Sequence, residues 1–140
     1  MQDILFHYLM RLVGTPYRWG GDDAIDGFDC SGLSIEFLTA GGILPFGYDS
    51  TADGLCAYLK TIGGQRTSIP KFGSLVFYGV PKIIHVAIAL DKDLMIEAGG
   101  GKSTTVDLKS AANDNAFIKV RPINYRKDLN QIVHPPFPWG

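Results

Sequence analysis

The hydrophobic pattern of this chain changes its period at Pro70, and that change limits the folds that the chain can adopt. Before Pro70, apolar residues recur every three or four positions, which is the spacing of amphipathic helices. After it, short runs rich in β-branched and aromatic residues alternate with turn residues, which is typical of strands. Helices followed by consecutive short strands favour the α+β class, with N-terminal helices packed on a central antiparallel β-sheet.

The helical spacing before Pro70 predicts three helices. They span about 3–12, 30–40 and 50–63. Asp29 is the expected N-cap of the second helix, because its carboxylate can accept hydrogen bonds from the free amides of the first turn. Ser50 and Asp53 match a capping box at the start of the third helix.

The pattern after Pro70 predicts five strands and a hairpin turn. The strands span 74–78, 83–90, 94–97, 104–108 and 117–121, and the turn spans 91–93. A chain of 140 residues favours one folded domain, which we place at 1–123. The remaining residues, 124–140, form a proline-rich segment that we expect to be an extended tail. Because Phe137 and Trp139 favour burial, wrapping around its own domain is preferred to binding a partner.

The composition argues against several classes of function. The chain has 13 basic and 14 acidic residues and no basic run, so binding to nucleic acid or to an anionic membrane has no electrostatic support. No apolar run approaches the roughly 18 residues of a membrane span. The N-terminus does not resemble a signal peptide, because His7 and Arg11 interrupt its apolar positions.

The cysteines and histidines do not suggest a metal site. Two cysteines are too few for a disulfide framework, although a single bridge between Cys30 and Cys56 stays open. The three histidines are scattered and lack the spacing of metal ligands. We therefore expect no metal and no cofactor.

Cys30 is the first candidate for chemistry. An isolated cysteine in an amphipathic helix is usually a small buried apolar residue, so its residue type alone is weak evidence. Its predicted place at a helix N-terminus is stronger evidence, because the free amides and the helix dipole there favour an anion. The same amides could stabilise a thiolate and the oxyanion of a tetrahedral intermediate. Cys56, inside the third predicted helix, is expected to pack in the core.

His85 is the best candidate for the base that a cysteine nucleophile needs. The other two histidines lie in the first helix and in the proline-rich segment. A lone histidine in an apolar strand is more often a core residue than a catalyst. With a period of two, however, His85 shares a face with Ala87 and Ala89, and such a small face would let a helix approach closely. We expect that helix to be the one that begins at Cys30.

Glu97 follows His85 by 12 residues, across the predicted turn. A neighbouring strand can therefore bring its carboxylate beside the imidazole. There it would orient the ring, stabilise its protonated form and raise its pKa. The alternative is that Glu97 lies at a solvated strand end.

Two blocks of the sequence resemble the NlpC/P60 family of cysteine peptidases. The first block is Pro16-Tyr17-Arg18-Trp19-Gly20-Gly21 followed by Asp29-Cys30-Ser31-Gly32-Leu33, and the second is Gly73-Ser74-Leu75-Val76-Phe77 followed by His85-Val86-Ala87-Ile88. The first block is specific, because many separate positions match the family motif. The second is weaker alone but has the expected order and spacing. The resemblance covers about residues 9–121.

The resemblance implies a papain-like fold and hydrolysis of peptide bonds in peptidoglycan stem peptides, often after D-glutamate, without a metal. It implies that Cys30 attacks the carbonyl carbon. It also implies that His85 holds the proton and later gives it to the leaving amine.

Further roles follow from the same resemblance. Tyr17 matches a family tyrosine that helps the oxyanion or holds the substrate, and packing in the core is an equal alternative. Asp29 and Ser31 match positions that contact the peptide ends of the substrate. The third catalytic position of the family is most often histidine, sometimes asparagine or glutamine. Glu97 stands there in this chain, and its carboxylate can still orient His85.

A single domain without a visible signal peptide or wall-binding repeat resembles stand-alone and phage-tail peptidases. This similarity gives two hypotheses for location, a virion tail or the extracellular or periplasmic space. The expected partner is peptidoglycan, and phage tail proteins could bind residues 124–140. Two other hypotheses are an inactive structural or binding module of a phage tail and a related thiol amidase or acyltransferase. Retention of Cys30, His85 and an acid at residue 97 favours the peptidase.

The run Gly99-Gly100-Gly101-Lys102-Ser103 resembles a phosphate-binding loop only superficially. That motif needs glycine five residues before Gly101, where this chain has Ile96, and it needs a following helix, where a strand is expected. We interpret the run as a glycine-rich turn at the mouth of the cleft.

Overall fold

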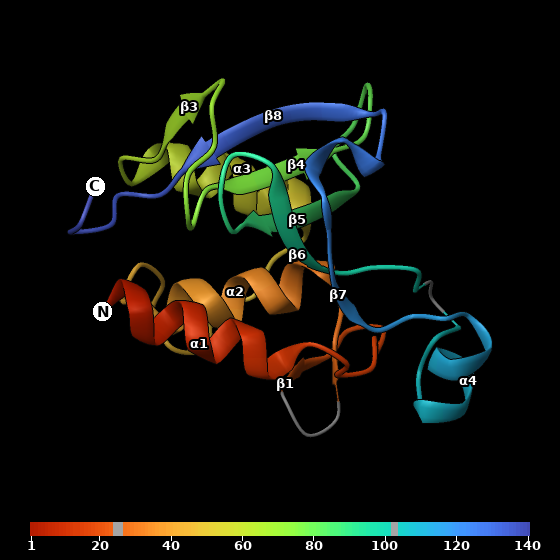
Figure 1. Cartoon of the computed structure of the whole chain (residues 1–140). Coiled ribbons are helices and arrows are strands. Elements are labelled where there is room, and N and C mark those ends of the chain that lie inside the picture. Colours follow the sequence, from red (N-terminus) through yellow and green to blue (C-terminus); the bar gives the residue numbers. More distant parts are fainter. Residues whose placement is uncertain (24–26, 102–103) are drawn as a thin grey trace.

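The computed structural model describes residues 1–23, 27–101 and 104–140 of the chain. Within these ranges the helical elements are α1 (Gln2–Leu12), α2 (Cys30–Ala40), α3 (Ala52–Thr61), α4 (Leu108–Asn113) and the 3-10 helix η1 (Ile123–Tyr125). The strands are β1 (Asp22–Asp23), β2 (Gly27–Phe28), β3 (Gln65–Thr67), β4 (Leu75–Tyr78), β5 (His85–Ala89), β6 (Leu94–Ala98), β7 (Ile118–Pro122) and β8 (Leu129–His134). The chain is therefore of the α+β class, as predicted (Figure 1).

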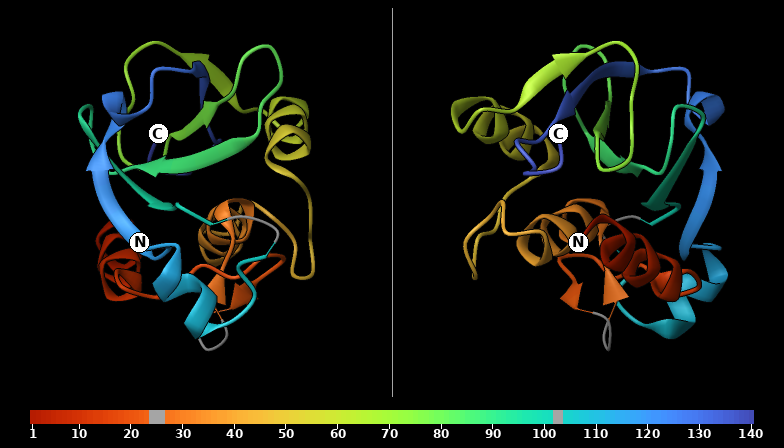
Figure 2. Two further views of the ribbon diagram at one scale, coloured as in Figure 1. Left: turned by 90° about the vertical axis from the view of Figure 1, so that its right-hand side faces the viewer. Right: turned by 60° about the vertical axis from the view of Figure 1, so that its left-hand side comes forward.

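The main sheet has six strands in the order β3-β8-β4-β5-β6-β7, and all of its neighbouring pairs are antiparallel. The sheet curves over α2, as both views of Figure 2 show. β1 and β2 form a separate short ribbon just before α2. Within the described residues, no helix is long and apolar enough to cross a membrane.

The two faces of the sheet form two hydrophobic clusters, because alternate side chains of a strand point to opposite faces. The larger cluster joins α1, α2 and α3 to the sheet. Its fully buried members include Leu9, Leu33, Phe37, Leu38, Leu55, Leu59, Leu75, Phe77, Val86, Ile88 and Val133. The smaller cluster consists of Val76, Tyr78, Ala87, Ala89, Met95 and Ile132, with Ile123 packed against it. The three helices thus share one face of the sheet.

The first two predicted helices are confirmed, and the third begins slightly later than predicted. Asp29 caps α2, because its Oδ1 atom accepts a hydrogen bond of 2.7 Å from the Gly32 amide. At α3 the cap is Thr51 rather than Ser50. The Thr51 hydroxyl accepts a hydrogen bond of 3.1 Å from the Gly54 amide, three residues later.

The predicted strand at 104–108 is wrong, whereas the predicted hairpin turn at 91–93 is confirmed between β5 and β6. Helix α4 begins at Leu108 and is capped by Asp107, whose side chain accepts a hydrogen bond from the Ser110 amide. The Ser110 side chain bonds back to the Asp107 amide, so a capping box is complete. This local pairing outweighs the β-propensity of the preceding threonines and valine.

The segment 124–140 is not a separate tail, so the boundary predicted at residue 123 is not a structural one. Residues 129–134 form β8, which lies between β3 and β4 in the sheet. Phe137 is only 5% exposed, and its ring lies 5.7 Å from that of Phe37 and 4.2 Å from that of Trp139 between centroids. The segment therefore packs on its own domain, as the aromatic residues suggested. The adjacent prolines hid the strand from the sequence pattern.

Candidate active site

An open cleft of about 1000 Å³ lies at the N-terminal end of α2. It is bounded by the loop before α3, the β4–β5 connection, the end of β6 and the segment after β7. All six residues predicted for the site line it: Tyr17, Asp29, Cys30, Ser31, His85 and Glu97. The glycines at 99–101 line it too, as predicted for that part of the run, whereas Lys102 and Ser103 lie outside the described residues.

Cys30 is the first residue of α2, and its side chain is partly exposed to the cleft. It is a free thiol, and so is Cys56, which is buried in α3; the two cysteines form no bridge. Gly32 lets the preceding loop reach this helix end, since a Cβ at residue 32 would collide with the carbonyl oxygen of Gly21. The thiol is therefore held at the N-terminus of α2, beside the cleft.

His85 is the first residue of β5, and its imidazole contacts both Cys30 and Glu97. The Nε2 atom lies 2.6 Å from Glu97 Oε1, and the imidazole also interacts with the Cys30 side chain. Burial alone would lower the pKa of His85. The hydrogen bonds and charges of Cys30 and Glu97 outweigh this effect and raise the pKa to about 9. The ring is therefore protonated at neutral pH.

The predicted contact between His85 and Cys30 exists, but the predicted packing face of β5 is wrong. Val86 and Ile88 belong to the cluster that contains the helices, whereas Ala87 lies in the cluster on the other face. The large branched side chains bury more apolar area against the helices than alanines would. His85 reaches Cys30 because it begins its strand beside the end of α2.

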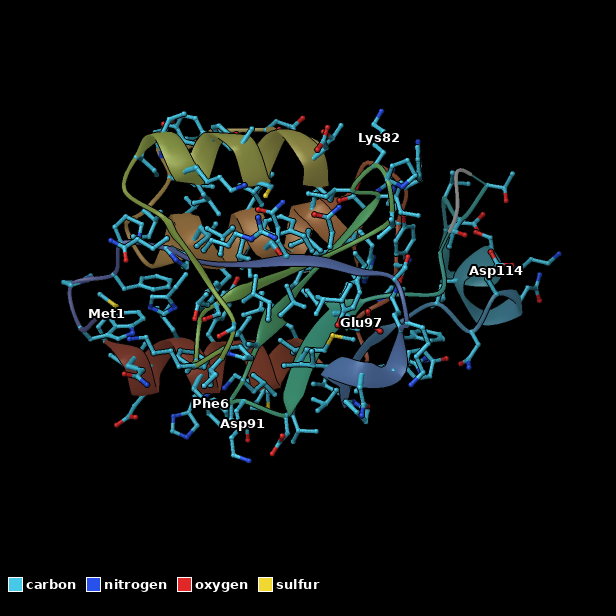
Figure 3. The ribbon with its side chains drawn as sticks, turned by 90° about the horizontal axis from the view of Figure 1, so that it is seen from above. Met1, Phe6, Lys82, Asp91, Glu97 and Asp114 are labelled. Carbon is cyan, nitrogen blue, oxygen red and sulfur yellow. The ribbon has the colours of Figure 1, made fainter. Side chains whose placement is uncertain are left out.

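Glu97 lies on β6 and is only 3% exposed, so it is not a solvated strand end. Figure 3 shows it in the interior, whereas Lys82, another residue of the cleft, lies at the periphery. Its Oε1 atom faces His85, and its Oε2 atom lies 3.1 Å from Arg121 Nε. No sequence pattern singled out Arg121, because its position depends on how β6 and β7 pair.

Tyr17 lines the cleft and is also a buried member of the larger core cluster. Burial, followed by the charges of Cys30 and Asp29, raises the pKa of its hydroxyl well above the usual range. The hydroxyl therefore stays a neutral hydrogen-bond donor near Cys30. Gly101 lies directly on the ring, so that a Cβ at residue 101 would collide with it. The glycine-rich turn thus holds the Tyr17 ring in place. This contact explains why residue 101 is a glycine.

Asp29 and Ser31 lie on either side of Cys30, and their side chains bond to each other and to the loop. Asp29 Oδ1 accepts hydrogen bonds from the Gly32 amide and from the Ser31 hydroxyl, at 2.7 and 3.3 Å. Asp29 Oδ2 accepts one from the Gly20 amide at 3.1 Å. Burial raises the pKa of Asp29, and these hydrogen bonds only partly oppose it. Both residues therefore shape the helix end that presents the thiol.

The site combines a thiol, an imidazolium and a buried carboxylate in one chain of contacts. This is the arrangement in which a base activates a nucleophile and a third group orients the base. Asp29 occupies the Gly32 amide in the first turn of α2, so the Cys30 and Ser31 amides and the Tyr17 hydroxyl are the groups that could donate to an oxyanion. Among the residues that the structure describes, no group of His, Cys, Asp or Glu side chains is placed to hold a metal ion.

The sequence of this chain is similar to those of known proteins. The bifunctional muramidase/DL-endopeptidase CwlT of Bacillus subtilis (strain 168) is 34% identical over 106 residues, which cover 72% of this chain and 30% of CwlT. This chain therefore spans under a third of that protein's length.

Two solved structures share the fold over almost the whole chain. The NlpC/p60 domain of the peptidoglycan hydrolase SagA has a TM-score of 0.64 at 26% identity, with 95% of this chain and 97% of that chain covered. RipD of Mycobacterium tuberculosis, described as a non-catalytic NlpC/p60 domain protein, has a TM-score of 0.65 at 22% identity, with 97% of each chain covered. A model of the NlpC/P60 family matches residues 14–122, and the chain therefore belongs to the NlpC/P60 family.

Proposed function

We propose that this chain is a cysteine peptidase that cleaves peptide bonds in the stem peptides of peptidoglycan. The observation that carries this function is the contact of His85 with both Cys30 and Glu97 inside an open cleft. The name of CwlT, a DL-endopeptidase, and that of SagA, a peptidoglycan hydrolase, support the substrate class.

In the first half of the reaction, the Cys30 thiolate attacks the carbonyl carbon of the scissile bond. His85 is protonated near neutral pH, because its pKa is raised to about 9, and it holds the proton that the thiol has lost. The amides at the start of α2 and the Tyr17 hydroxyl donate hydrogen bonds to the oxyanion. His85 then gives its proton to the leaving amine, and the acyl group stays on the sulfur.

In the second half, a water molecule attacks the acyl carbon while neutral His85 accepts the proton of that water. The thiolate leaves, and the imidazolium forms again. Glu97 keeps the ring oriented in both halves and stabilises its charged form. Asp29 and Ser31, which border the thiol, are the proposed contacts for the peptide ends of the substrate.

The alternative function is binding of peptidoglycan without cleavage. The fold alone permits it, since RipD shares the fold and is described as non-catalytic, with an adaptation to peptidoglycan binding. The site of this chain favours catalysis, because nucleophile, base and orienting carboxylate are all present and in contact. A thiol amidase or acyltransferase would use the same three groups on a different bond.

A phage-tail location is the second part of the sequence-based hypothesis. Docking through residues 124–140 would require this segment to leave the domain, where Phe137 is buried and β8 is paired on both sides. A tail protein would therefore have to bind another surface. Mass spectrometry of purified virions tests this location. Absence of the chain from the virions would exclude a location in the phage tail.

The test of the function is digestion of purified peptidoglycan under reducing conditions, with released fragments identified by mass spectrometry. We expect the wild type to release stem-peptide fragments and Cys30→Ala to release none. The matched control is Cys56→Ala, which removes the other thiol and should retain cleavage. Release of intact stem peptides would instead indicate an amidase. No release by the wild type from several wall types, together with binding to them, would indicate the non-catalytic function.

A further inference from the structure

The two oxygens of the buried Glu97 carboxylate face two different cations. Oε1 lies 2.6 Å from His85 Nε2, and Oε2 lies 3.1 Å from Arg121 Nε. A buried carboxylate is stabilised when cations or hydrogen-bond donors face its oxygens. In the proposed reaction His85 is neutral after it has protonated the leaving amine. Arg121 is then the cationic partner that still holds the Glu97 carboxylate in place.

The strand register shows that this second cation is not simply the nearest basic residue. Lys119 on β7 lies directly opposite Glu97 on β6. Its Nζ atom, however, donates a hydrogen bond of 2.9 Å to the carbonyl oxygen of Asn115. Arg121 lies two residues further along β7, opposite Met95, and reaches Glu97 diagonally across the strand pair.

Arg121 is itself held in place. Its guanidinium carbon lies 4.1 Å from the centroid of the Tyr125 ring, in the 3-10 helix that follows β7. The charge of Arg126 also acts on Glu97, but its guanidinium donates two hydrogen bonds to Asp128, at 2.9 and 2.7 Å. A planar guanidinium that is stacked on a ring presents its N–H donors in a fixed direction, which a lysine ammonium cannot do.

We propose that Arg121 is a positioning residue that keeps the Glu97 carboxylate oriented toward His85 throughout the reaction. This role rests on the proposed peptidase function, but it concerns a residue for which the sequence and the comparisons give no role. Arg121 acts through Glu97 and not on the substrate. Its loss should therefore weaken the imidazolium–thiolate pair of His85 and Cys30.

The first test is a double-mutant cycle with Arg121→Gln, Glu97→Gln and the double variant, assayed on a stem-peptide substrate. Arg121→Gln should lower kcat by about tenfold, the lower end of the range for groups that orient metal-ligating histidines, with little change in KM. In the Glu97→Gln background, Arg121→Gln should lower kcat by less than about twofold, because the effects of residues in one chain of contacts are not additive. Arg121→Lys keeps the positive charge but not the planar guanidinium, so it should recover part of the activity.

The second test needs no substrate and so separates failure of this role from failure of the proposed function. The rate of Cys30 alkylation by iodoacetamide is followed between pH 5 and 10 by mass spectrometry. In Arg121→Gln, alkylation near neutral pH should slow, and its rise should move to higher pH, because the imidazolium that supports the thiolate is weakened. Thermal melting verifies that each variant is folded.

Lys119→Gln is the matched control, because it removes a positive charge from β7 without removing a contact of Glu97. It should leave both the kinetics and the alkylation profile unchanged. An Arg121→Gln variant with raised KM, unchanged kcat and an undiminished effect in the Glu97→Gln background would show that Arg121 binds substrate instead. An unchanged alkylation profile in a folded Arg121→Gln variant would also overturn the role.

Discussion

The raised pKa of His85 predicts that the stability of the folded protein depends on pH in the alkaline range. The pKa is raised from 6.5 to about 9 in the folded state, because the hydrogen bonds and charges of Cys30 and Glu97 outweigh the effect of burial. The folded state therefore binds a proton more tightly than the unfolded chain. The resulting stabilisation is fully present below pH 6.5 and is lost as the pH rises through 9.

The magnitude follows from the difference between the two pKa values. At about 1.4 kcal/mol for each pH unit, a rise from 6.5 to about 9 corresponds to roughly 3 kcal/mol of unfolding free energy. This is a large fraction of the total for a domain of this size, which is of the order of 5–15 kcal/mol. His85→Gln should lose this pH-dependent stabilisation, because glutamine does not titrate.

Urea denaturation at intervals between pH 6 and 10, under reducing conditions, measures this pH-dependent part of the unfolding free energy. The free energy of unfolding of the wild type should fall by roughly 3 kcal/mol more than that of His85→Gln over this range. Cys30→Ala should remove much of the difference, because the hydrogen bond to Cys30 is the largest of the contributions that raise the pKa. Parallel curves for the wild type and His85→Gln would refute the assignment of a protonated imidazole.

Three further substitutions test other parts of the structure. Gly101→Ala should displace the Tyr17 ring and lower kcat about tenfold or more, as loss of an oxyanion donor does. Binding of peptidoglycan in a pull-down assay should persist. An unchanged kcat would exclude Tyr17 as an oxyanion donor. Phe137→Ala should lower the free energy of unfolding by about 3–5 kcal/mol in urea titrations, because the ring is buried against Phe37; a change below about 0.5 kcal/mol, the size of an exposed-site effect, would mean that the segment is not part of the core. Gly32→Ala should lower both the melting temperature and the activity, since its Cβ collides with the loop carbonyl at Gly21, and a wild-type melting curve would contradict the close approach.

The parts of the fold that depend on local chemistry could be predicted from the sequence. The N-cap at Asp29 and the helix that begins at Cys30 follow from residues that are neighbours in the chain. The turn at 91–93 follows in the same way, and Asp91 Oδ1 accepts hydrogen bonds from the Asp93 and Leu94 amides. The strand at 104–108 was a local error, because a capping box competes with β-propensity there.

The remaining features depend on which strands become neighbours, and the sequence does not state this. β8 pairs with β3 and β4 across more than 50 residues of chain, and the prolines beside it mask its alternation. Arg121 meets Glu97 only because β6 and β7 pair in one particular register. The packing face of β5 is set by the apolar area that Val86 and Ile88 bury and not by how closely a helix can approach Ala87 and Ala89.

The position of β8 has a consequence for the order in which this protein can be made. Synthesis proceeds from the N-terminus, so β3 and β4 leave the ribosome well before the strand that lies between them. Until residues 129–134 emerge, both strands keep an unpaired edge, and the core lacks Val133 and Phe137. Such edges invite pairing with other chains until the missing strand is in place. We therefore expect the thiol site to gain its stable form only after translation has passed the last strand.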